Sequence, residues 1–411
     1  HSLRQLYWDG RFYRDDYRGI AAYIQATSTT QDAILINAPA QIETFDYYYH
    51  GPLTEYPLPQ ERPLNRERTV QTLQEMVAQH SRIYAVFWAT DESDPERLIE
   101  TWLDQRCFKA LDSWFGNVRL VVYAAPQREA TAIAQPTDCQ FGPSIHLRGY
   151  TLLTPDLRSG DIAQLTLFWE AAEPVVGRYK VFTHMVDGRG NIVGQRDSEP
   201  GGGARPTTIW QVGELIADNY GLPIQAGSPP GEHVLRIGLY DQNTGARLPI
   251  TQNGQPVGDA LDLARLTIGS ASSPPPASAL DMQHEDRICW EGLCLIGHSL
   301  HRLGYEHLQG VVLEPGQTAR LTLYWRREGG EPTTDHFTAA LTDRANRTVV
   351  WEQPIQLTGG LFPLTSWRDG EVVRDMQQLP LPTDLRPGTY RLTLRASNET
   401  TRRSLGDMTI R

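Results

Sequence analysis

The sequence predicts a multidomain protein with an N-terminal α/β layered domain and a mainly parallel sheet, followed by two homologous antiparallel β-sandwiches, Ig-like or jelly-roll-like. Two observations predict this fold class. Helical and buried-strand patterns alternate near the N-terminus, and the last two thirds of the chain repeat at a domain-sized spacing of 155 to 157 residues. The expected boundaries are 1–126 for the α/β domain, 139–269 and 287–411 for the sandwiches, and 270–286 for a Pro/Ser-rich linker.

In the first domain, the spacing of apolar residues predicts alternating helices and strands. Helices are expected at 16–26, 41–49, 65–79 and 94–105, and strands at 33–37, 82–88 and 118–123. The clearest helix places Leu73 and Met76 on one face, with Asn65 as its N-cap. The continuous apolar run at 33–37 is typical of a strand buried on both faces. Elements alternating at this spacing indicate a layered sheet with helices.

After residue 139 the helical period disappears. Alternating apolar segments at 165–169, 179–185, 233–240 and 387–394 are separated by turns rich in Gly, Pro, Asp and Asn. This pattern is typical of antiparallel sandwiches. The segment from Ser270 to Asp286 has no periodicity and contains three consecutive prolines, so we expect an extended linker there.

Four blocks of sequence define the repeat. Cys139–Tyr150 recurs as Cys294–Tyr305, Leu165–Trp169 as Leu321–Trp325, Trp210–Asp218 as Trp367–Asp375, and Pro230-Gly231 as Pro387-Gly388. Because an active site is seldom built twice in tandem, we expect the shared residues to serve the fold. This structural set is Trp169, Trp325, Trp210, Trp367, Glu214, Glu371, Asp218 and Asp375. The alternative is a sugar-stacking platform, formed by an indole beside its neighbouring carboxylates.

Composition and charge exclude some classes of function. The formal net charge of −11 argues against a nucleic-acid partner, which would require clustered Lys and Arg. No run of about 18 apolar residues is present, so we expect no membrane span in this chain. Because the sequence begins at His1, we expect a mature form or a fragment, released from a membrane-anchored precursor.

The four cysteines point to a compartment. Cys107, Cys139, Cys289 and Cys294 permit three pairings. We favour Cys289–Cys294, whose short loop keeps the sulfurs close, together with Cys107–Cys139. These disulfides would place the protein in an oxidising, extracytoplasmic space, at the cell surface or secreted. The alternative is four inert buried thiols.

The order of patterns resembles a known family. The residues that carry the resemblance are Asp15-Asp16-Tyr17-Arg18-Gly-Ile-Ala-Ala-Tyr23-Ile24, Asp32-Ala-Ile-Leu-Ile-Asn37-Ala-Pro39, Phe45-x-Tyr47-Tyr48, Arg82-Ile-Tyr-Ala-Val-Phe-Trp88, Asp94-Pro95, Trp102-Leu103-Asp104 and Val118-Arg-Leu-x-x-Tyr123. They resemble the extracytoplasmic C-terminal region of bacterial membrane glycosyltransferases related to the protein O-mannosyltransferases, which use polyprenyl-phosphate sugars. The likeness covers residues 1 to about 125, and the sandwiches resemble modules appended after that region. The acidic catalytic loop of such enzymes has no counterpart in this sequence, so the resemblance implies a chain without catalytic residues or cofactors.

A ligand site in the first domain would lie where parallel strands end, because ligands favour the carboxyl ends of such strands. The aromatic cluster after residue 46 adds stacking surfaces. The candidate glycan-binding or ligand-binding residues are Asn37, Tyr47, Tyr48, Trp88 and Asp91. Structural packing is the alternative role for these residues.

Three further motifs have simpler explanations than a ligand site. Cys289-x4-Cys294-x3-His298-x2-His301 has zinc-ligand residue types, but a structural staple fits the cysteines better, so we expect no metal. Asp187-Gly-Arg-Gly-Asn191 lacks the acidic positions of a calcium loop and fits a hairpin turn. Gly201-Gly-Gly203 has no following Lys-Ser/Thr, which a phosphate loop requires.

Three hypotheses of function follow. The leading one is a non-catalytic extracytoplasmic region of a glycosyltransferase-like membrane protein, acting in glycan or acceptor recognition or in docking to a cell-envelope component. The second is a structural protein that self-assembles into a filament or surface layer, a homo-oligomer or polymer paired through sandwich edges. The third is a carbohydrate-active enzyme, for which no acid/base pair is evident.

Overall fold

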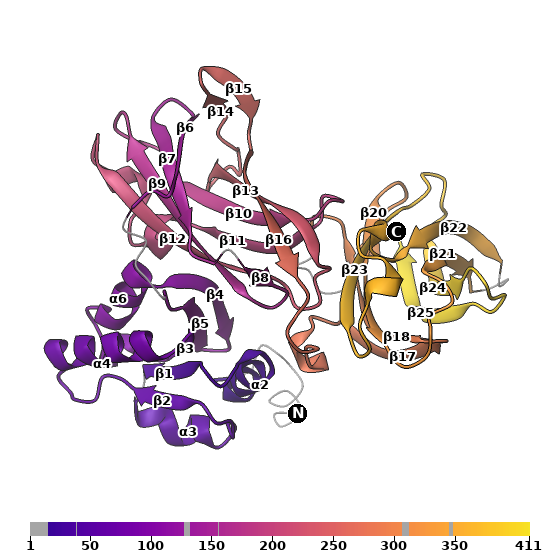
Figure 1. The fold of residues 1–411 in the computed structure, drawn as a ribbon, viewed down its shortest axis with the longest axis horizontal. Helices are drawn as coiled ribbons and strands as arrows, with labels where there is room; N and C mark the ends of the chain where they lie inside the picture. The colour runs from indigo at the N-terminus through magenta and orange to yellow at the C-terminus, as the bar shows by residue number, and fades with distance from the viewer. Residues whose placement is uncertain (1–14, 38, 127–131, 155, 306–311, 345–347) are drawn as a thin grey trace.

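The computed structural model describes residues 15–37, 39–126, 132–154, 156–305, 312–344 and 348–411, and is mostly β-structure. An α/β unit lies below the first sandwich, and the second sandwich lies beside the first (Figure 1). The linker that carries the short helix η5 (Ala277–Ala279) connects the two sandwiches. All three units therefore meet around the base of the first sandwich.

The N-terminal sheet is mixed in direction. It contains β1 (Ala33–Asn37), β2 (Thr54–Pro57), β3 (Arg82–Phe87), β4 (Phe108–Phe115) and β5 (Val118–Ala124), in the order β2-β1-β3-β5-β4. β1 pairs in parallel with β2 and β3, whereas β5 is antiparallel to β3 and β4. The expectation of a mainly parallel sheet fails at β4 and β5, because a tight turn at Gly116, whose φ is 64°, joins them as a hairpin.

Helices cover both faces of this sheet. They are α2 (Tyr17–Thr27), η2 (Pro39–Gln41), α3 (Ile42–Asp46), α4 (Arg66–Gln79), α5 (Thr90–Ser93) and α6 (Leu98–Arg106). Ile20 and Ile24 of α2 pack with Ile34 on one face, and Leu73 of α4 packs with Leu35 on the other. The 33–37 run is consequently buried on both sides. The Asn65 side chain accepts a hydrogen bond from Arg68 N and caps α4, as its position in the sequence predicts.

The first sandwich contains two facing sheets. Its strands are β6 (Gln135–Phe141), β7 (Ile145–Leu152), β8 (Leu157–Arg158), β9 (Ile162–Ala171), β10 (Tyr179–Val186), β11 (Ile192–Ser198), β12 (Leu215–Pro223), β13 (Gly231–Asp241), β14 (Ile250–Gln252), β15 (Gln255–Gly258) and β16 (Leu261–Gly269). The short helices η3 (Pro200–Gly203) and η4 (Thr207–Ile209) precede β12. The sheet orders are β11-β10-β13-β16-β8 and β12-β9-β7-β6-β14-β15. One apolar core joins residues of both sheets.

The second sandwich repeats this strand order without the β14–β15 hairpin. Its strands are β17 (His284–Trp290), β18 (Leu293–Arg302), β19 (Val312–Leu313), β20 (Thr318–Arg327), β21 (His336–Asp343), β22 (Val349–Gln356), β23 (Val372–Pro380), β24 (Gly388–Ala396) and β25 (Arg403–Ile410). The helices η6 (Leu357–Gly360) and η7 (Leu364–Ser366) correspond to η3 and η4. The sheets are β22-β21-β24-β25-β19 and β23-β20-β18-β17. Even the parallel edge pair of the first copy, β16 with β8, recurs as β25 with β19.

The structure corrects the register of the first repeat block. Gly149 pairs with Phe168, and Gly297 pairs with Tyr324 at the equivalent place, so Gly297 rather than Gly304 corresponds to Gly149. A Cβ at Gly149 or Gly297 would lie within 2.7 Å of a backbone oxygen of the neighbouring strand, so both positions require glycine. Cys139 lies on the strand before this glycine, whereas Cys294 lies on the glycine's own strand. The two cysteines are therefore not equivalent.

The repeat also begins earlier than its sequence match. Thr151 Oγ1 donates to Ala132 O and accepts from Ala134 N. Ser299 Oγ likewise donates to Asp281 O and accepts from Gln283 N. The copies thus start near residues 132 and 281. The expected starts at 139 and 287 fall inside β6 and β17, respectively.

Only one of the two predicted disulfides forms. Cys289 and Cys294 are bonded across β17 and β18. Cys107 and Cys139 are free, buried thiols, so the predicted pairing between them is wrong. The physical reason is that Cys107 packs in the core of the α/β domain and Cys139 in the core of the first sandwich.

Each sandwich docks on the preceding domain through an equivalent strand and turn. On β12, a Cβ at Gly221 would lie 2.5 Å from Phe108 O of β4, which shows how closely the two backbones approach. On β23, Arg374 N donates to Gly227 O of the first sandwich at 2.7 Å. The turn that precedes β12 takes part in the same docking contact. A Cβ at Gly202 of η3 would lie 3.0 Å from a carboxylate oxygen of Asp104 in α6.

The second docking contact includes an inter-domain ion pair. Arg189, in the β10–β11 turn, reaches Asp375 at 3.5 Å and donates to Gln377 at 3.1 Å. The side chain of Asp375 is fully buried, so this guanidinium compensates a charge inside the second sandwich. A Cβ at Gly359 of η6 would collide with Arg189, as expected for a turn pressed against it. The two sandwiches are therefore joined by specific polar contacts in addition to the linker.

Candidate functional site

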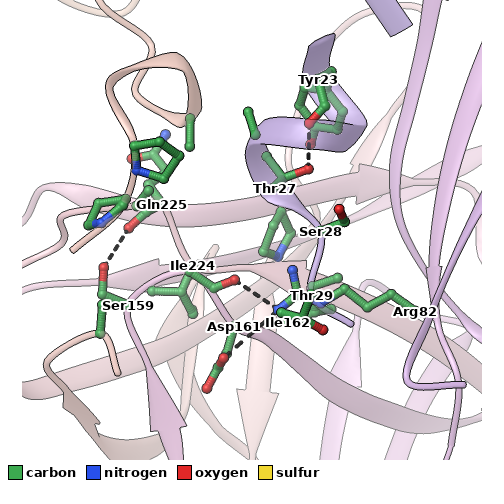
Figure 2. A pocket seen from close by; sticks show the side chains of 18 of the residues that line it. Tyr23, Thr27, Ser28, Thr29, Arg82, Ser159, Asp161, Ile162, Ile224 and Gln225 are labelled. Atoms are coloured by element: carbon green, nitrogen blue, oxygen red, sulfur yellow. Dashed lines mark hydrogen bonds and ion pairs between the residues drawn. The ribbon is translucent and has the colours of Figure 1, made fainter. Parts of the chain in front are cut away.

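A cavity of about 420 Å³ lies where the three domains meet. Its walls come from the end of α2, the start of β3, the β8–β9 turn, the end of β12, the proline-rich linker and the outer face of the second sandwich. The polar lining residues are Tyr23, Thr27, Ser28, Thr29, Arg82, Tyr84, Ser159, Asp161, Gln225, Ser272, Ser273, Asp281, Tyr324 and Arg374. Figure 2 shows the α2 residues on one side of this cavity and Asp161, Ile162 and Ile224 on another. No single domain could form it alone.

Arg82 links the α/β domain to the first sandwich at the cavity wall. Its Nη2 atom donates to Gly160 O at 3.1 Å and lies 3.9 Å from Asp161 Oδ1. Arg158 N donates to Asp161 Oδ2 at 2.9 Å, which holds this carboxylate in its turn. Arg82 is the first residue of the buried strand β3, so the sheet fixes the base of its side chain. One end of the cavity therefore has a positioned guanidinium beside a positioned carboxylate.

Hydroxyl groups form a second wall. Thr27 Oγ1 donates to Tyr23 O at 2.8 Å (Figure 2). The same oxygen lies 3.1 Å from the Tyr84 hydroxyl. Burial raises the pKa of Tyr84 to about 12, and burial also raises the pKa of Tyr23. Both phenols therefore stay protonated at neutral pH, and because Thr27 gives its own proton to Tyr23 O, the Tyr84 hydroxyl donates to Thr27 Oγ1. Ser28 follows as the C-cap of α2, with extended backbone.

The second sandwich closes the cavity with Tyr324 and Arg374. Tyr324 OH donates to Asp281 O at 2.8 Å, which fixes the phenol against the linker. Arg374 Nη1 lies 3.0 Å from the sulfur of Met376, a weak acceptor. Because a guanidinium has five donor hydrogens, Arg374 keeps capacity to bind a polar or anionic ligand. The cavity thus contains guanidinium groups from two different domains.

The lining is suited to binding rather than to one evident reaction. Clustered hydroxyls, tyrosine rings and guanidinium groups can donate and accept hydrogen bonds to a polyhydroxylated or anionic molecule, with apolar contacts from the linker prolines. The volume falls within the range of about 300–1,000 Å³ that is usual for small-ligand sites. Asp161 and Asp281 are the carboxylate residues of this lining.

The residues predicted as a ligand site do not line this cavity. Asn37 is fully buried at the end of β1 and donates from Nδ2 to Leu58 O at 3.1 Å. Tyr47 is 74% exposed and packs edge-on against Tyr48. Trp88 is half-buried after β3, and Asp91 is exposed in α5.

Asn37 and Trp88 are neighbours, since Trp88 N donates to Asn37 O at 3.5 Å. Tyr47 and Tyr48 follow α3, and the Arg18 guanidinium of α2 lies over the Tyr48 ring. The structure therefore brings four of the five predicted residues together in two pairs, Asn37 with Trp88 and Tyr47 with Tyr48, while Asp91 lies in α5. A ligand role for them remains a prediction.

The repeat-shared residues lie in cores and turns. Trp169 and Trp325 are fully buried at the centre of each sandwich. Trp210 Nε1 donates to a carbonyl five residues earlier, and Trp367 Nε1 does the same. These indoles are therefore inside the protein, with their faces covered.

The carboxylates of the repeat bind backbone. Asp218 accepts from Gly201 N at 2.8 Å, and Asp375 accepts from Thr358 N at 3.0 Å. Glu214 lies 3.5 Å from Gln211 N, and Glu371 accepts from Arg368 N at 2.8 Å. These contacts close the η3 and η6 turns and the loops that follow them, which are structural tasks.

The residues of the zinc-like and calcium-like motifs contact other residues of the protein. Cys289, Cys294 and Glu328 are close enough to hold an ion, but the two sulfurs are bonded to each other. His298 Nδ1 lies 2.5 Å from Asp286, and the His298 ring stacks on His284. In the β10–β11 turn, Asp187 accepts hydrogen bonds from Arg189 N and Asn191 N, which is an Asx-type turn. His301, the last residue of the zinc-like motif, lies 2.7 Å from Gln283.

Sequence reasoning missed the cavity residues because they come from three domains. A run of hydroxyl residues, Thr27 to Thr30, begins at the last residue of α2 and was the clearest available signal. Arg82 and Arg374 lie in strands whose sequence pattern predicts only core packing. That both line one cavity depends on how the domains dock, which composition and periodicity do not predict.

Comparison with known proteins gives no assignment: no protein-family model matches the chain, and no curated protein matches it. Among the described residues, no helix is both long and apolar enough to cross a bilayer. The functional argument therefore rests on the cavity and on the surfaces of this molecule.

Proposed function

We propose that this chain is a non-catalytic extracytoplasmic recognition module of a glycosyltransferase-like membrane protein, and that it binds a glycan in the three-domain cavity. The observation that carries the proposal is the cavity itself, whose hydroxyl-bearing residues come from all three domains and whose arginines come from two of them. Sugars require several hydrogen-bond partners around an apolar contact, and the tyrosine and proline walls supply the latter. The Cys289–Cys294 disulfide is consistent with an oxidising compartment.

The chemistry of the lining favours a glycan that carries an anionic group. Arg82 and Arg374 can each donate two parallel hydrogen bonds to a carboxylate or phosphate. Asp161 already lies near Arg82, so a bound anion would be held chiefly on the Arg374 side. Neutral hydroxyls of the same glycan would bind Thr27, Ser28 and Ser159.

A glycan array probed with the full chain tests this function. Acidic oligosaccharides should bind, and the hits should then be titrated by calorimetry. Arg374→Gln and Ser28→Phe should each weaken binding at least about tenfold, because one removes a guanidinium and the other fills the cavity. The matched control is Arg236→Gln, which removes an exposed arginine paired with Asp262 on the first sandwich and should leave binding unchanged. Binding that survives both cavity variants would reject the site.

Self-assembly is the second candidate function, and exposed sheet edges favour it. All four residues of β15 are exposed at the end of their sheet, and β22 carries Val349 and Val350 at the end of another. Unprotected edges of this kind can pair with another chain. Light scattering with negative-stain imaging at micromolar concentration tests this candidate. Regular polymers would support it, and one monodisperse species of single-chain mass would exclude it as an intrinsic property.

A further inference from the structure

The two copies of one loop differ in what covers them. In the first sandwich the loop runs from Ile209 to Leu215, and in the second from Ser366 to Val372. The two are equivalent because Leu215 pairs with Glu170 at the place where Val372 pairs with Arg326. Each loop also has its tryptophan indole bonded to the carbonyl five residues earlier. The backbone frame is therefore the same in both.

The two loops differ in the side chains that they expose to solvent. Ile209, Val212 and Leu215 are 57%, 56% and 52% exposed. Their counterparts in the second copy are two exposed polar residues, Ser366 and Asp369, and the buried Val372, which is 5% exposed. The first loop thus presents three aliphatic side chains to solvent where the second presents polar ones or none. We name these three residues the loop patch.

One side of the second loop contacts a proline-rich segment of the chain itself, through Arg368, Gly370, Glu371 and Val372. Arg368 Nη2 donates to Ala271 O at 2.9 Å. Pro274 and Pro275 line the same small cavity as Glu371 and Val372, and a Cβ at Gly370 would lie 3.8 Å from Pro274 Cγ. Further along the linker, Leu280 packs with Val372. An extended segment of Ser, Ala and Pro is thus what this type of loop binds in this protein.

We infer that the loop patch of the first sandwich binds an extended, proline-containing segment of a partner polypeptide, as its twin binds the linker. The apolar side chains supply the contact area, since burying exposed aliphatic surface is favourable. Gln211 stands where Arg368 donates to the linker and offers an amide donor for a backbone carbonyl. An extended proline segment loses little conformational entropy on binding, which suits a shallow surface.

A synthetic peptide with the sequence of residues 269–280 is the probe. Fluorescence anisotropy of the labelled peptide with the full chain should show saturable binding with a dissociation constant below about 1 mM. The double variant Val212→Ser/Leu215→Ser should weaken this binding at least about tenfold. Both side chains are exposed, so the double variant should keep the melting temperature of the parent. A peptide with its three prolines changed to alanine should bind more weakly.

Two matched variants separate the loop patch from other surfaces. Val257→Ser removes an aliphatic side chain that is 43% exposed on β15 and should leave peptide binding unchanged. Arg368→Ala loosens the natural linker contact, so a change in affinity here would mean that the peptide binds the second loop and would overturn the inference. Lack of saturable binding up to about 1 mM would also overturn it. So would a double variant that alters self-association while leaving peptide binding intact.

Discussion

Asp218 and Asp375 hold equivalent places in the two sandwiches, each with its carboxylate inside the protein. Asp218 accepts hydrogen bonds from Gly201 N and from the Tyr220 hydroxyl. Asp375 accepts from Thr358 N and Gln377 and also lies near Arg189. Burial raises the pKa of both carboxyl groups to about 6, which means that desolvation outweighs these contacts.

This raised pKa predicts a pH dependence of stability. The folded protein holds the Asp218 proton more tightly than the unfolded chain, so the stabilisation is present at low pH and is lost as the pH rises from about 4 to about 6. Relative to Asp218→Asn, the unfolding free energy of the parent should fall by about 2 kcal/mol between pH 4 and 7. Denaturant titrations across this range measure it. Asp262→Asn, at an exposed ion pair, is the control.

The disulfide predicts a sensitivity to reductant. Its small loop, with a sequence separation of 5, should contribute about 2 kcal/mol to the second sandwich. Dithiothreitol should therefore lower the melting temperature of the parent. The double variant Cys289→Ala/Cys294→Ala should melt lower from the start and show no further shift, since Cys107 and Cys139 are free in both proteins. An unchanged melting curve of the parent in reductant would contradict this assignment.

The cysteines show what residue-level reasoning could predict. Proximity along the chain favoured the Cys289–Cys294 pairing, because a sequence separation of 5 keeps the two sulfurs close. The pairing of Cys107 with Cys139 required knowledge of which core each residue enters. That depends on the tertiary arrangement, so an even number of cysteines was a misleading guide.

At the scale of elements, the corrected register of the repeat gives a direct prediction. A Cβ at Gly297 would lie 2.7 Å from His284 O, whereas a Cβ at Gly304, whose φ is 83°, has no atom of the described residues within 4 Å. Gly297→Ala should therefore cost about 2–4 kcal/mol of stability through displaced backbone. Gly304→Ala should cost only about 1 kcal/mol, from its left-handed backbone. Equal losses in denaturant titrations would contradict the register.

Hydrophobic periodicity predicted the well-buried helices and strands of the first domain and missed the edge strands, which are short or partly polar. The helices α2 and α4 and the strands β1, β3 and β5 occur close to their expected positions. The edge strands β2 and β4 were not expected, since β2 is short and half-buried and β4 becomes polar along its length. The sequence match of Gly149-Tyr150 with Gly304-Tyr305 is seven residues out of register. It arose because the two copies differ in the length of the segment that follows β7 and β18.

At the scale of the whole molecule, docking between domains creates the features of functional interest. The cavity needs Arg82 from the first domain, Ser159 from the second and Arg374 from the third. The same docking places Arg189 on the buried Asp375. These contacts join residues of different domains, so the pattern of a single domain's sequence could not predict them, and the candidate site was missed for that reason.

The cavity persists only if the three domains form one fixed body around it. Small-angle X-ray scattering on the peak from a sizing column measures whether they do. We expect a single species of one chain mass, 46.2 kDa, whose profile fits the docked arrangement in Figure 1 without added inter-domain motion. A profile that needs an ensemble of separated domains would contradict it, because the cavity would then not persist.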